Sequence, residues 1–448
     1  MTSRQAAQEG NGSHSAFDGH HPPSLELIDD CVHCGFCLPS CPTYALWGEE
    51  MDSPRGRIYL MKLGSEGKIA LGDTLVRHID QCLGCMACVT ACPSGVQYEK
   101  LIEATRAQVE RRYTRSLGSR FLRRIIFALF PRPGRLSLLC APLWLYQRSG
   151  IQWLTRRSGL LKLMPEGFRG MESMLPALRF GQWGSKMPKR VPAQGAERGK
   201  AALLLGCVQR VFFANVNAAT ARVLSAEGFE VIVPKDQGCC GALMVHSGLE
   251  EEALNLARKT IDELERASAD LIVTNAAGCG STLKEYGHLL RDDPEYAGRA
   301  RAFSAKCKDV SEVLANIEPR ASRSPLNLRV VYQDACHLQH AQGVRSEPRK
   351  VLGTIPGLQV VEIEESGLCC GSAGIYNMVE PKTARDLGDR KVANILAAAP
   401  DAIISSNPGC LLQISAGLNR AGRKASVAHL VEMLDASIQG RPGPETQS

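Results

Sequence analysis

Two runs of four cysteines near the start of the chain share one spacing. The spacing is Cys-x2-Cys-x2-Cys-x3-Cys-Pro, and the runs span residues 31–42 and 82–93. Such runs hold cubane [4Fe–4S] clusters: three closely spaced thiolates bind one cluster, and the cysteine before the proline binds the other. The pair of runs therefore predicts two clusters and one-electron transfer. A zinc site or a disulfide framework is the competing interpretation, but neither needs the third close cysteine or the proline.

The crossed pattern gives each predicted cluster three ligands from one run and one from the other. The ligands of the first cluster are Cys31, Cys34, Cys37 and Cys92, and those of the second are Cys82, Cys85, Cys88 and Cys41. We expect residues 23–103 to form a helical, two-cluster ferredoxin-type domain, because the stretches 58–63 and 75–79 have helical character.

The chain of 448 residues contains eighteen cysteines. Residues 1–22 are polar without an apolar signal segment and are expected to be a disordered leader, and the tail 437–448 is expected to be disordered too. Thiols at this density predict a reducing compartment, so we expect the protein in the cytoplasm.

Residues 104–199 are expected to form a helical connector and a polar linker with unusual charge. Between residues 105 and 165 there are thirteen Lys or Arg residues and one acidic residue, Glu110, while the whole chain has a net charge of +7. Apolar residues alternate with these basic ones. The combination is typical of a surface for an anionic membrane or an acidic partner, and equally of a helix packed on its own domain. We therefore consider peripheral attachment to the inner face of the cell membrane.

From residue 200 onward one pattern occurs twice, in segments 200–320 and 321–436. Each copy has an apolar run ending in a cysteine, then a helix, a short strand, Cys-Cys-Gly, a long helix, and a strand followed by Gly-Cys. Alternating strands and helices predict a duplicated parallel α/β domain with its cysteines at the carboxyl ends of the strands. The two thiol sets are Cys207, Cys239, Cys240 and Cys279 in the first copy, and Cys336, Cys369, Cys370 and Cys410 in the second.

The sequence contains neither a dinucleotide-binding glycine fingerprint nor a P-loop, so we expect no flavin or NAD on this chain. No arrangement of residues suggests a catalytic acid or base, and no nucleic-acid-binding motif accompanies the basic charge. Any oxidation of a carbon substrate would then take place on a partner.

Several short segments resemble the iron–sulfur subunit of bacterial glycolate oxidase. They are CVHCGFC (31–37), PRGRIYL (54–60), CPSGV (92–96), NAATARVL (217–224), KEYG (284–287), LQHAQ (338–342) and LCCGSAGI (368–375). The resemblance implies a subunit that is not catalytic alone. It would work with flavin-binding subunits that oxidise glycolate to glyoxylate, and would pass electrons toward the membrane quinone pool. The same role in a complex that oxidises lactate or another 2-hydroxy acid is the alternative.

The Cys-Cys-Gly segments also resemble the CCG domain of heterodisulfide reductase, with one departure. That family ends the motif in Cys-x-x-Cys, whereas Cys279 is followed by Gly-Ser-Thr and Cys410 by Leu-Leu-Gln. Because the fifth thiol is missing, thiol–disulfide chemistry is disfavoured. The four remaining thiols of each copy leave three alternatives open: a third cubane cluster, zinc, or reduced thiols.

Overall fold

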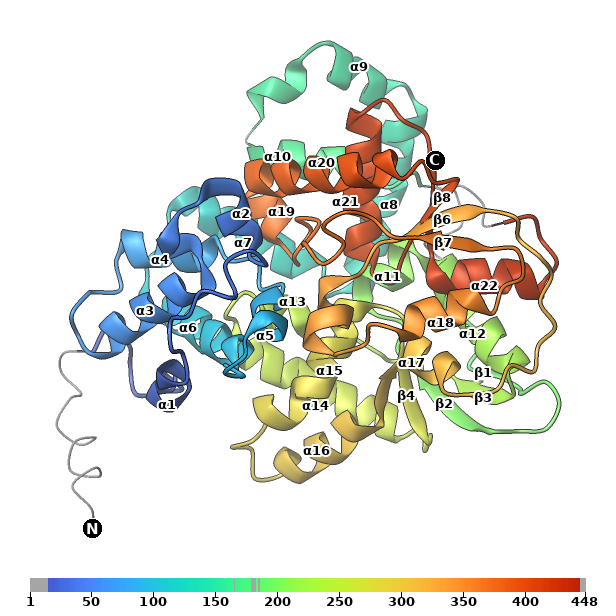
Figure 1. Ribbon diagram of the computed structural model, residues 1–448, viewed down its shortest axis with the longest axis horizontal. Coiled ribbons are helices and arrows are strands. Elements are labelled where there is room, and N and C mark those ends of the chain that lie inside the picture. Colours follow the sequence, from blue (N-terminus) through green and yellow to red (C-terminus); the bar gives the residue numbers. More distant parts are fainter. Residues whose placement is uncertain (1–14, 165, 179–182, 184–185, 444–448) are drawn as a thin grey trace. The chain divides into compact units, whose positions relative to one another are not determined.

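The structure is a computed structural model that describes residues 15–164, 166–178, 183 and 186–443 (Figure 1). It divides into two compact units. Unit 1 comprises the chain up to Arg120 together with residues 243–250, and unit 2 comprises residues 121–242 and the chain from Glu251 onward.

The secondary structure of the described part of unit 1 is helical. Its helices are α1 (Leu25–Asp29), α2 (Pro42–Trp47), η1 (Glu50–Asp52), α3 (Pro54–Ser65), α4 (Asp73–Asp80), α5 (Ala87–Ala91) and α6 (Tyr98–Arg112). The expected helices around 58–63 and 75–79 are confirmed as α3 and α4. Helix α3 begins where the hydroxyl of Ser53 accepts a hydrogen bond from the backbone N–H of Gly56 at 3.1 Å, with proline at the first helical position. Apolar side chains of α3, α4 and α6 form the core.

Residues 15–22 are ordered within unit 1, although the sequence predicted that they belong to a disordered leader. Residues 1–14 lie outside the described residues, but Phe17 is buried beside Gly64 of α3. The backbone N–H of Asp18 donates to Oε1 of Gln108, a buried residue of α6, at 2.8 Å. The polar composition of residues 15–22 gave no sign that the Phe17 side chain and the buried amide of Gln108 would order this segment.

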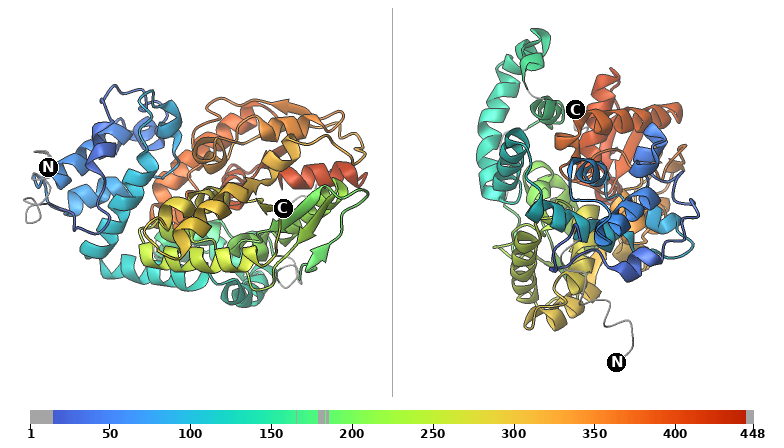
Figure 2. Two further views of the ribbon diagram at one scale, coloured as in Figure 1. Left: turned by 90° about the horizontal axis from the view of Figure 1, so that it is seen from below. Right: turned by 90° about the vertical axis from the view of Figure 1, so that its left-hand side faces the viewer.

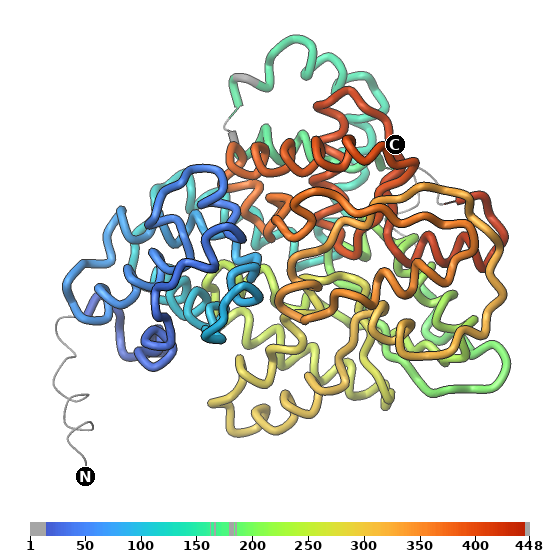
Figure 3. Tube along the Cα trace, viewed as in Figure 1, coloured from blue at the N-terminus to red at the C-terminus, as the bar shows by residue number. Residues whose placement is uncertain are grey.

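Helices without strands follow unit 1. They are α7 (Leu117–Leu129), α8 (Pro133–Arg148), α9 (Ile151–Arg157), η2 (Leu160–Leu163) and α10 (Glu166–Ser173). Figure 3 traces α8 and α9 along the outside of unit 2. No helix in the described part of the chain has the length and apolar character needed to cross a membrane.

Two sheets form the centre of unit 2. The first has strand order β1-β3-β2-β4-β5, and the second has order β7-β6-β8-β9. The strands of the first sheet are β1 (Arg190–Val191), β2 (Gly199–Leu203), β3 (Phe229–Ile232), β4 (Leu271–Thr274) and β5 (Cys307–Asp309). Those of the second are β6 (Arg329–Tyr332), β7 (Gln359–Val361), β8 (Ala402–Ser405) and β9 (Ser426–His429). In register, Ala202 of β2 pairs with Ile272 of β4, and Val331 of β6 pairs with Ile403 of β8.

Pairing is parallel throughout both sheets except at β1, which runs antiparallel to β3. This strand lies in the segment 104–199, which the sequence predicted to form a helical connector and a polar linker. Two residues, Arg190 and Val191, are too few for an alternating pattern to be recognised. The expected all-parallel sheet is therefore corrected at this one edge.

Helices pack against the strands of each sheet (Figure 2). Those around the first sheet are α11 (Cys207–Phe212), α12 (Ala214–Ala226), α14 (Glu250–Glu265), α15 (Ala277–Leu289), α16 (Tyr296–Lys306) and α17 (Val310–Ala315). The short helix α13 (Ala242–Val245) belongs mostly to unit 1. Those around the second are η4 (His337–Ala341), α18 (Glu347–Gly353), α19 (Tyr376–Val379), α20 (Pro381–Ala397), α21 (Pro408–Arg420) and α22 (Leu430–Ile438). One hydrophobic cluster includes Val231 and Val273 from the first sheet and Val331 and Ile403 from the second. The two sheets therefore share a continuous core.

Candidate iron–sulfur and thiol sites

Four cysteines from two distant segments line one pocket in unit 1. They are Cys41, Cys82, Cys85 and Cys88, the set that the sequence predicts for the second cluster. Cys41 precedes α2 as its N-cap, and Cys88 lies in α5. The loop between Cys82 and Cys88 turns through left-handed backbone at Gly84 (φ +64°) and Met86 (φ +61°). Soft thiolate ligands suit an iron–sulfur cluster, and all four are buried, so this donor set fits the predicted group.

A buried guanidinium lies beside this pocket. Nη1 of Arg57 is 4.0 Å from Sγ of Cys41, and Nε donates to the carbonyl oxygen of His78 at 2.6 Å. Burial alone would raise the pKa of Cys82, but the positive charges of Arg57 and Arg106 lower it below its ordinary value. Positive charge at this place stabilises thiolates and would offset the negative charge of a cluster.

The Arg57 side chain is held by a buried polar network. Its Nη2 lies 3.3 Å from Oδ1 of Asp52, and the same oxygen lies 2.8 Å from Nδ1 of His78. The hydroxyl of Thr43 accepts from both terminal nitrogens of Arg57, at 3.3 and 3.2 Å. The sequence gave no signal for Asp52 and Thr43, because they act through tertiary contacts.

The other predicted set is more open to solvent. Cys34 is exposed, and Cys31, Cys37 and Cys92 are half-buried. Burial raises the pKa of the Cys31 thiol, and the nearby thiols of Cys92 and Cys34 raise it further. Three members of this set therefore share one neighbourhood. The pKa of the fourth, Cys37, is raised to about 11, mainly by burial, with Cys31 among its neighbours.

The first CCG thiol set lies beyond the carboxyl ends of the strands, as expected. Sγ of Cys207 is 3.5 Å from Sγ of Cys239, and hydrogen bonds link Cys239 to Cys240 and Cys240 to Cys279. The hydrogen bond to Cys239 and burial raise the pKa of Cys207 far above its ordinary value. The structure therefore brings all four predicted residues of this copy together.

The second CCG set has the same arrangement in a different electrostatic environment. Sγ of Cys369 lies 4.0 Å from Sγ of Cys336, and Cys370 is linked to Cys369 and Cys410. The hydrogen bond from Cys369 lowers the pKa of Cys336, and the imidazole of His337, whose Nδ1 is 3.5 Å away, lowers it further. Hydrogen bonds from Cys369 and Cys410 likewise lower the pKa of Cys370. The pKa values of Cys369 and Cys410 shift in the opposite direction, to well above their ordinary value, mainly through the hydrogen bonds to Cys336 and Cys370.

The backbone conformation after each cysteine pair requires glycine. Gly241 has φ +86° and Gly371 has φ +87°, a left-handed conformation that disfavours other residues. A Cβ atom would stand 3.3 Å from the carbonyl oxygen of Ala253 at the first and 2.5 Å from that of Ala384 at the second. Only glycine lets the cysteine loop pass this close to the following long helix.

One side chain connects the loops that carry the two thiol sets. Oδ1 of Asn407 accepts from the backbone N–H of Gly278, the neighbour of Cys279, at 3.4 Å. Its Nδ2 lies 3.4 Å from Sγ of Cys410. In the first copy, the residue three positions before the last cysteine is Ala276. The sequence gave no signal for Asn407, because the contact joins segments 129 residues apart.

A cysteine-lined pocket in a helical unit and cysteine loops beyond the strand ends of parallel sheets define an iron–sulfur protein built for electron transfer. Family models agree with this class. Residues 27–96 match a 4Fe-4S dicluster domain, and residues 201–284 and 330–415 both match a cysteine-rich domain. Residues 118–175 match the linker region of the glycolate oxidase iron-sulfur subunit.

The chain belongs to the family of glycolate oxidase iron–sulfur subunits. It is 41% identical to the probable glycolate oxidase iron-sulfur subunit of Bacillus subtilis (strain 168), over 91% of this chain and 93% of that protein. It is 37% identical to the glycolate oxidase iron-sulfur subunit of Escherichia coli (strain K12), over 92% and 95%. Lactate utilization protein A of an Exiguobacterium species is 30% identical, over 53% of this chain and 98% of its own length.

Proposed function

We propose that this chain relays electrons, one at a time, from the reduced flavin of partner subunits through [4Fe–4S] clusters toward the quinone pool. The complex so formed oxidises glycolate to glyoxylate, and this subunit is not catalytic alone. The observation that carries the proposal is the convergence of Cys41 with Cys82, Cys85 and Cys88 on one pocket, which unites two separate sequence runs. A cluster accepts and releases single electrons, as a relay from a two-electron donor requires.

The proposed ligand sets follow the crossed pattern. Cys82, Cys85, Cys88 and Cys41 would hold one cluster, supported by their shared pocket. Cys31, Cys34, Cys37 and Cys92 would hold the other, supported by the nearness of Cys34 and Cys92 to Cys31, whose pKa they raise. In domain terms, residues 23–103 would form the two-cluster domain and 104–199 the connector.

Segments 200–320 and 321–436 would be two copies of one CCG domain. Matching strand orders, β3-β2-β4-β5 and β7-β6-β8-β9, support a duplication. So do the corresponding capping boxes, formed by Asp309 with Glu312 and by His429 with Glu432. Either thiol set is a candidate for a third cluster or zinc, because each brings cysteines from separate loops together.

Attachment to the inner face of the cell membrane would bring the relay to its quinone acceptor. Large apolar side chains are exposed along α8, α9 and η2, with Trp153 at 62% and Leu163 at 82%. Arginines accompany them, and the guanidinium of Arg157 lies over the Trp153 ring at 5.3 Å. Apolar side chains among basic ones suit an anionic lipid surface.

The test is anaerobic reduction of the cluster-loaded chain by its flavin-binding partner subunits. Glycolate is expected to bleach the cluster absorbance, and a soluble quinone analogue is expected to restore it. Lactate replaces glycolate in a parallel reaction, and faster bleaching with lactate would favour the alternative substrate. A chain that remains oxidised while the partner flavin is reduced would overturn the relay.

A further inference from the structure

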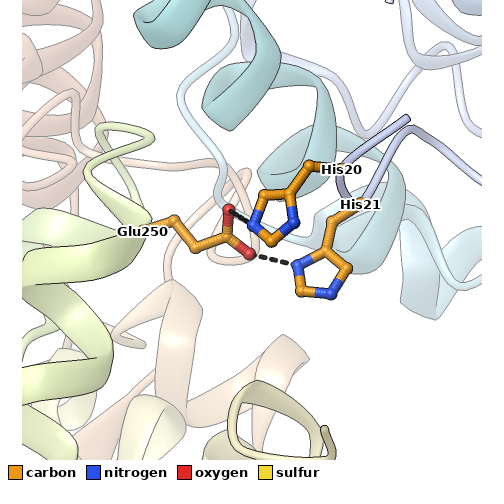
Figure 4. A group of neighbouring side chains, drawn as sticks. All are labelled: His20, His21 and Glu250. Atoms are coloured by element: carbon orange, nitrogen blue, oxygen red, sulfur yellow. Dashed lines mark hydrogen bonds and ion pairs between the residues drawn. The ribbon is translucent and has the colours of Figure 1, made fainter. Parts of the chain in front are cut away.

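We propose that His20, His21 and Glu250 form a binding site for a divalent transition ion, best suited to Zn²⁺, which ties the N-terminal segment to the start of α14. One potential ligand atom from each residue lies within 4.8 Å of the others. Figure 4 shows both imidazoles directed at the two oxygens of the Glu250 carboxylate. All three residues belong to unit 1 and are separate from the cysteine sites.

The donor atoms are close enough to converge on one ion, which would replace the direct contact between His21 and Glu250. Nδ1 of His21 lies 2.5 Å from Oε1 of Glu250, and Nε2 of His20 lies 3.6 Å from Oε2. The two imidazole rings are stacked, with centroids 4.2 Å apart, so their ligand atoms are presented side by side. Two imidazole nitrogens and one carboxylate oxygen are a donor set that Zn²⁺ takes in proteins, with a fourth position left for water. Half-exposed side chains leave that position accessible.

The backbone that carries the histidines is already ordered. The N–H of His20 donates to Oδ1 of Asp18 at 2.9 Å, and its carbonyl oxygen accepts from Nε2 of Gln108 at 2.9 Å. Gln108 is fully buried in α6, so it anchors the loop to a rigid element. Metal binding then costs little additional ordering of the chain.

The positive charge of Arg111 beside the site is compensated. Its Nη1 donates to Oε2 of Glu250 at 2.9 Å, while Nε and Nη2 donate to the Asp18 carboxylate at 3.2 and 3.1 Å. Nη2 also donates to the carbonyl oxygen of His20 at 2.5 Å. Two carboxylates and one guanidinium leave a net negative charge for a cation. Arg111 thus orients Glu250 from outside, as supporting residues do in metal sites.

The test measures zinc bound by the cluster-loaded full chain under anaerobic conditions, with Zn²⁺ in competition against a chromophoric chelator. The variants are His20→Ala with His21→Ala, and Glu250→Gln, which keeps an oxygen for Arg111. His288→Ala is the matched control, because it removes a histidine of unit 2. Zinc held by cysteines should be the same in the unsubstituted chain, the two variants and the control, so it does not contribute to the difference in bound zinc between them. Unchanged cluster absorbance verifies that each variant is folded.

We expect both variants to lose one equivalent of zinc that the control retains. The affinity should fall at least as far as the roughly 10- to 100-fold that loss of a supporting contact costs. Zinc should also slow amide hydrogen exchange in residues 15–22 of the unsubstituted chain and not in the variants. Equal zinc stoichiometry and affinity in the unsubstituted chain, the two variants and the control would overturn the metal site. Unchanged amide hydrogen exchange in residues 15–22 on zinc binding would overturn the proposed link between the N-terminal segment and α14.

Discussion

Nε2 of His429, the last residue of β9, lies 2.8 Å from the backbone carbonyl oxygen of Asn275, which follows β4 in the other sheet. Nδ1 of the same ring accepts a hydrogen bond from the backbone N–H of Val431 at 3.2 Å. An acceptor at Nδ1 and a donor at Nε2 define a neutral imidazole. His429 can therefore accept the capping bond of α22 and donate to the other sheet at the same time only in its uncharged form.

This contact predicts an acid-sensitive stability. Burial lowers the pKa of His429 to about 4, below the value of about 6.5 in an unfolded chain. Between these values the unfolded state binds more protons than the folded state, so stability falls as the pH drops from about 6.5 to 4. The loss attributable to this group between pH 7 and pH 5 is about 2 kcal/mol.

The measurement compares the unsubstituted protein with His429→Asn, which keeps an acceptor for the helix cap but does not titrate. Denaturant unfolding of both proteins at pH 7 and pH 5 gives the difference. Burial raises the pKa of neighbouring Glu432 to about 7, and this acts in the opposite direction, so only the comparison is diagnostic. Equal pH dependence in the two proteins would contradict the assigned role of His429.

Removal of the buried guanidinium beside the cluster pocket should have two effects. Arg57→Met leaves the buried carboxylate of Asp52 with one cationic partner fewer, at a cost of about 3–5 kcal/mol in the free energy of unfolding. It also removes positive charge near Cys41 and Cys82, so the reduction potential of one cluster should become more negative. Arg57→Lys should shift that potential less.

EPR-monitored redox titration reads out the potential, with Arg55→Met as a matched control. Arg55 donates to the carbonyl oxygen of His33 at 3.1 Å and lies near Cys37, in the loop of the other cluster. The two substitutions should therefore shift different signals. A shift of the same signal by both would contradict the separation of the ligand sets.

The exposed apolar side chains of α9 should promote binding to anionic vesicles. Burial of a large apolar side chain contributes about 1.5–3 kcal/mol. Replacing Trp153 and Leu154 with serine should weaken binding by about tenfold or more. Binding should also decline as salt rises, because arginine charges contribute. Leu25→Ser in α1 is the control; an equal effect there, or none at α9, would contradict the proposal.

Local signals in the sequence predicted many elements of the fold and which cysteines lie near one another. The repeated cysteine spacing indicated which residues of unit 1 gather, and alternating strands and helices placed the CCG thiols at the strand ends. Helices α3 and α4 contain the expected stretches 58–63 and 75–79. These features depend on spacing and periodicity along the chain.

Contacts between distant segments could not be predicted in the same way. Asn407 bridges the two thiol loops, and Gln108 orders residues 15–22, although neither belongs to a recognisable motif. The His20–His21–Glu250 group joins residues that lie 229 positions apart. In each case the residue type is common and only the fold gives it a partner.

Paired cysteine substitutions test the crossed ligand assignment, on which the electron relay rests. The readout is iron and acid-labile sulfide per chain, measured anaerobically after cluster reconstitution. Cys41→Ala with Cys82→Ala places both changes in one predicted cluster and should remove about four irons. Cys41→Ala with Cys31→Ala affects both clusters and should remove about eight. The reverse result, four irons lost with Cys31 and eight with Cys82, would contradict the crossed assignment, and no loss in either protein would contradict the relay itself.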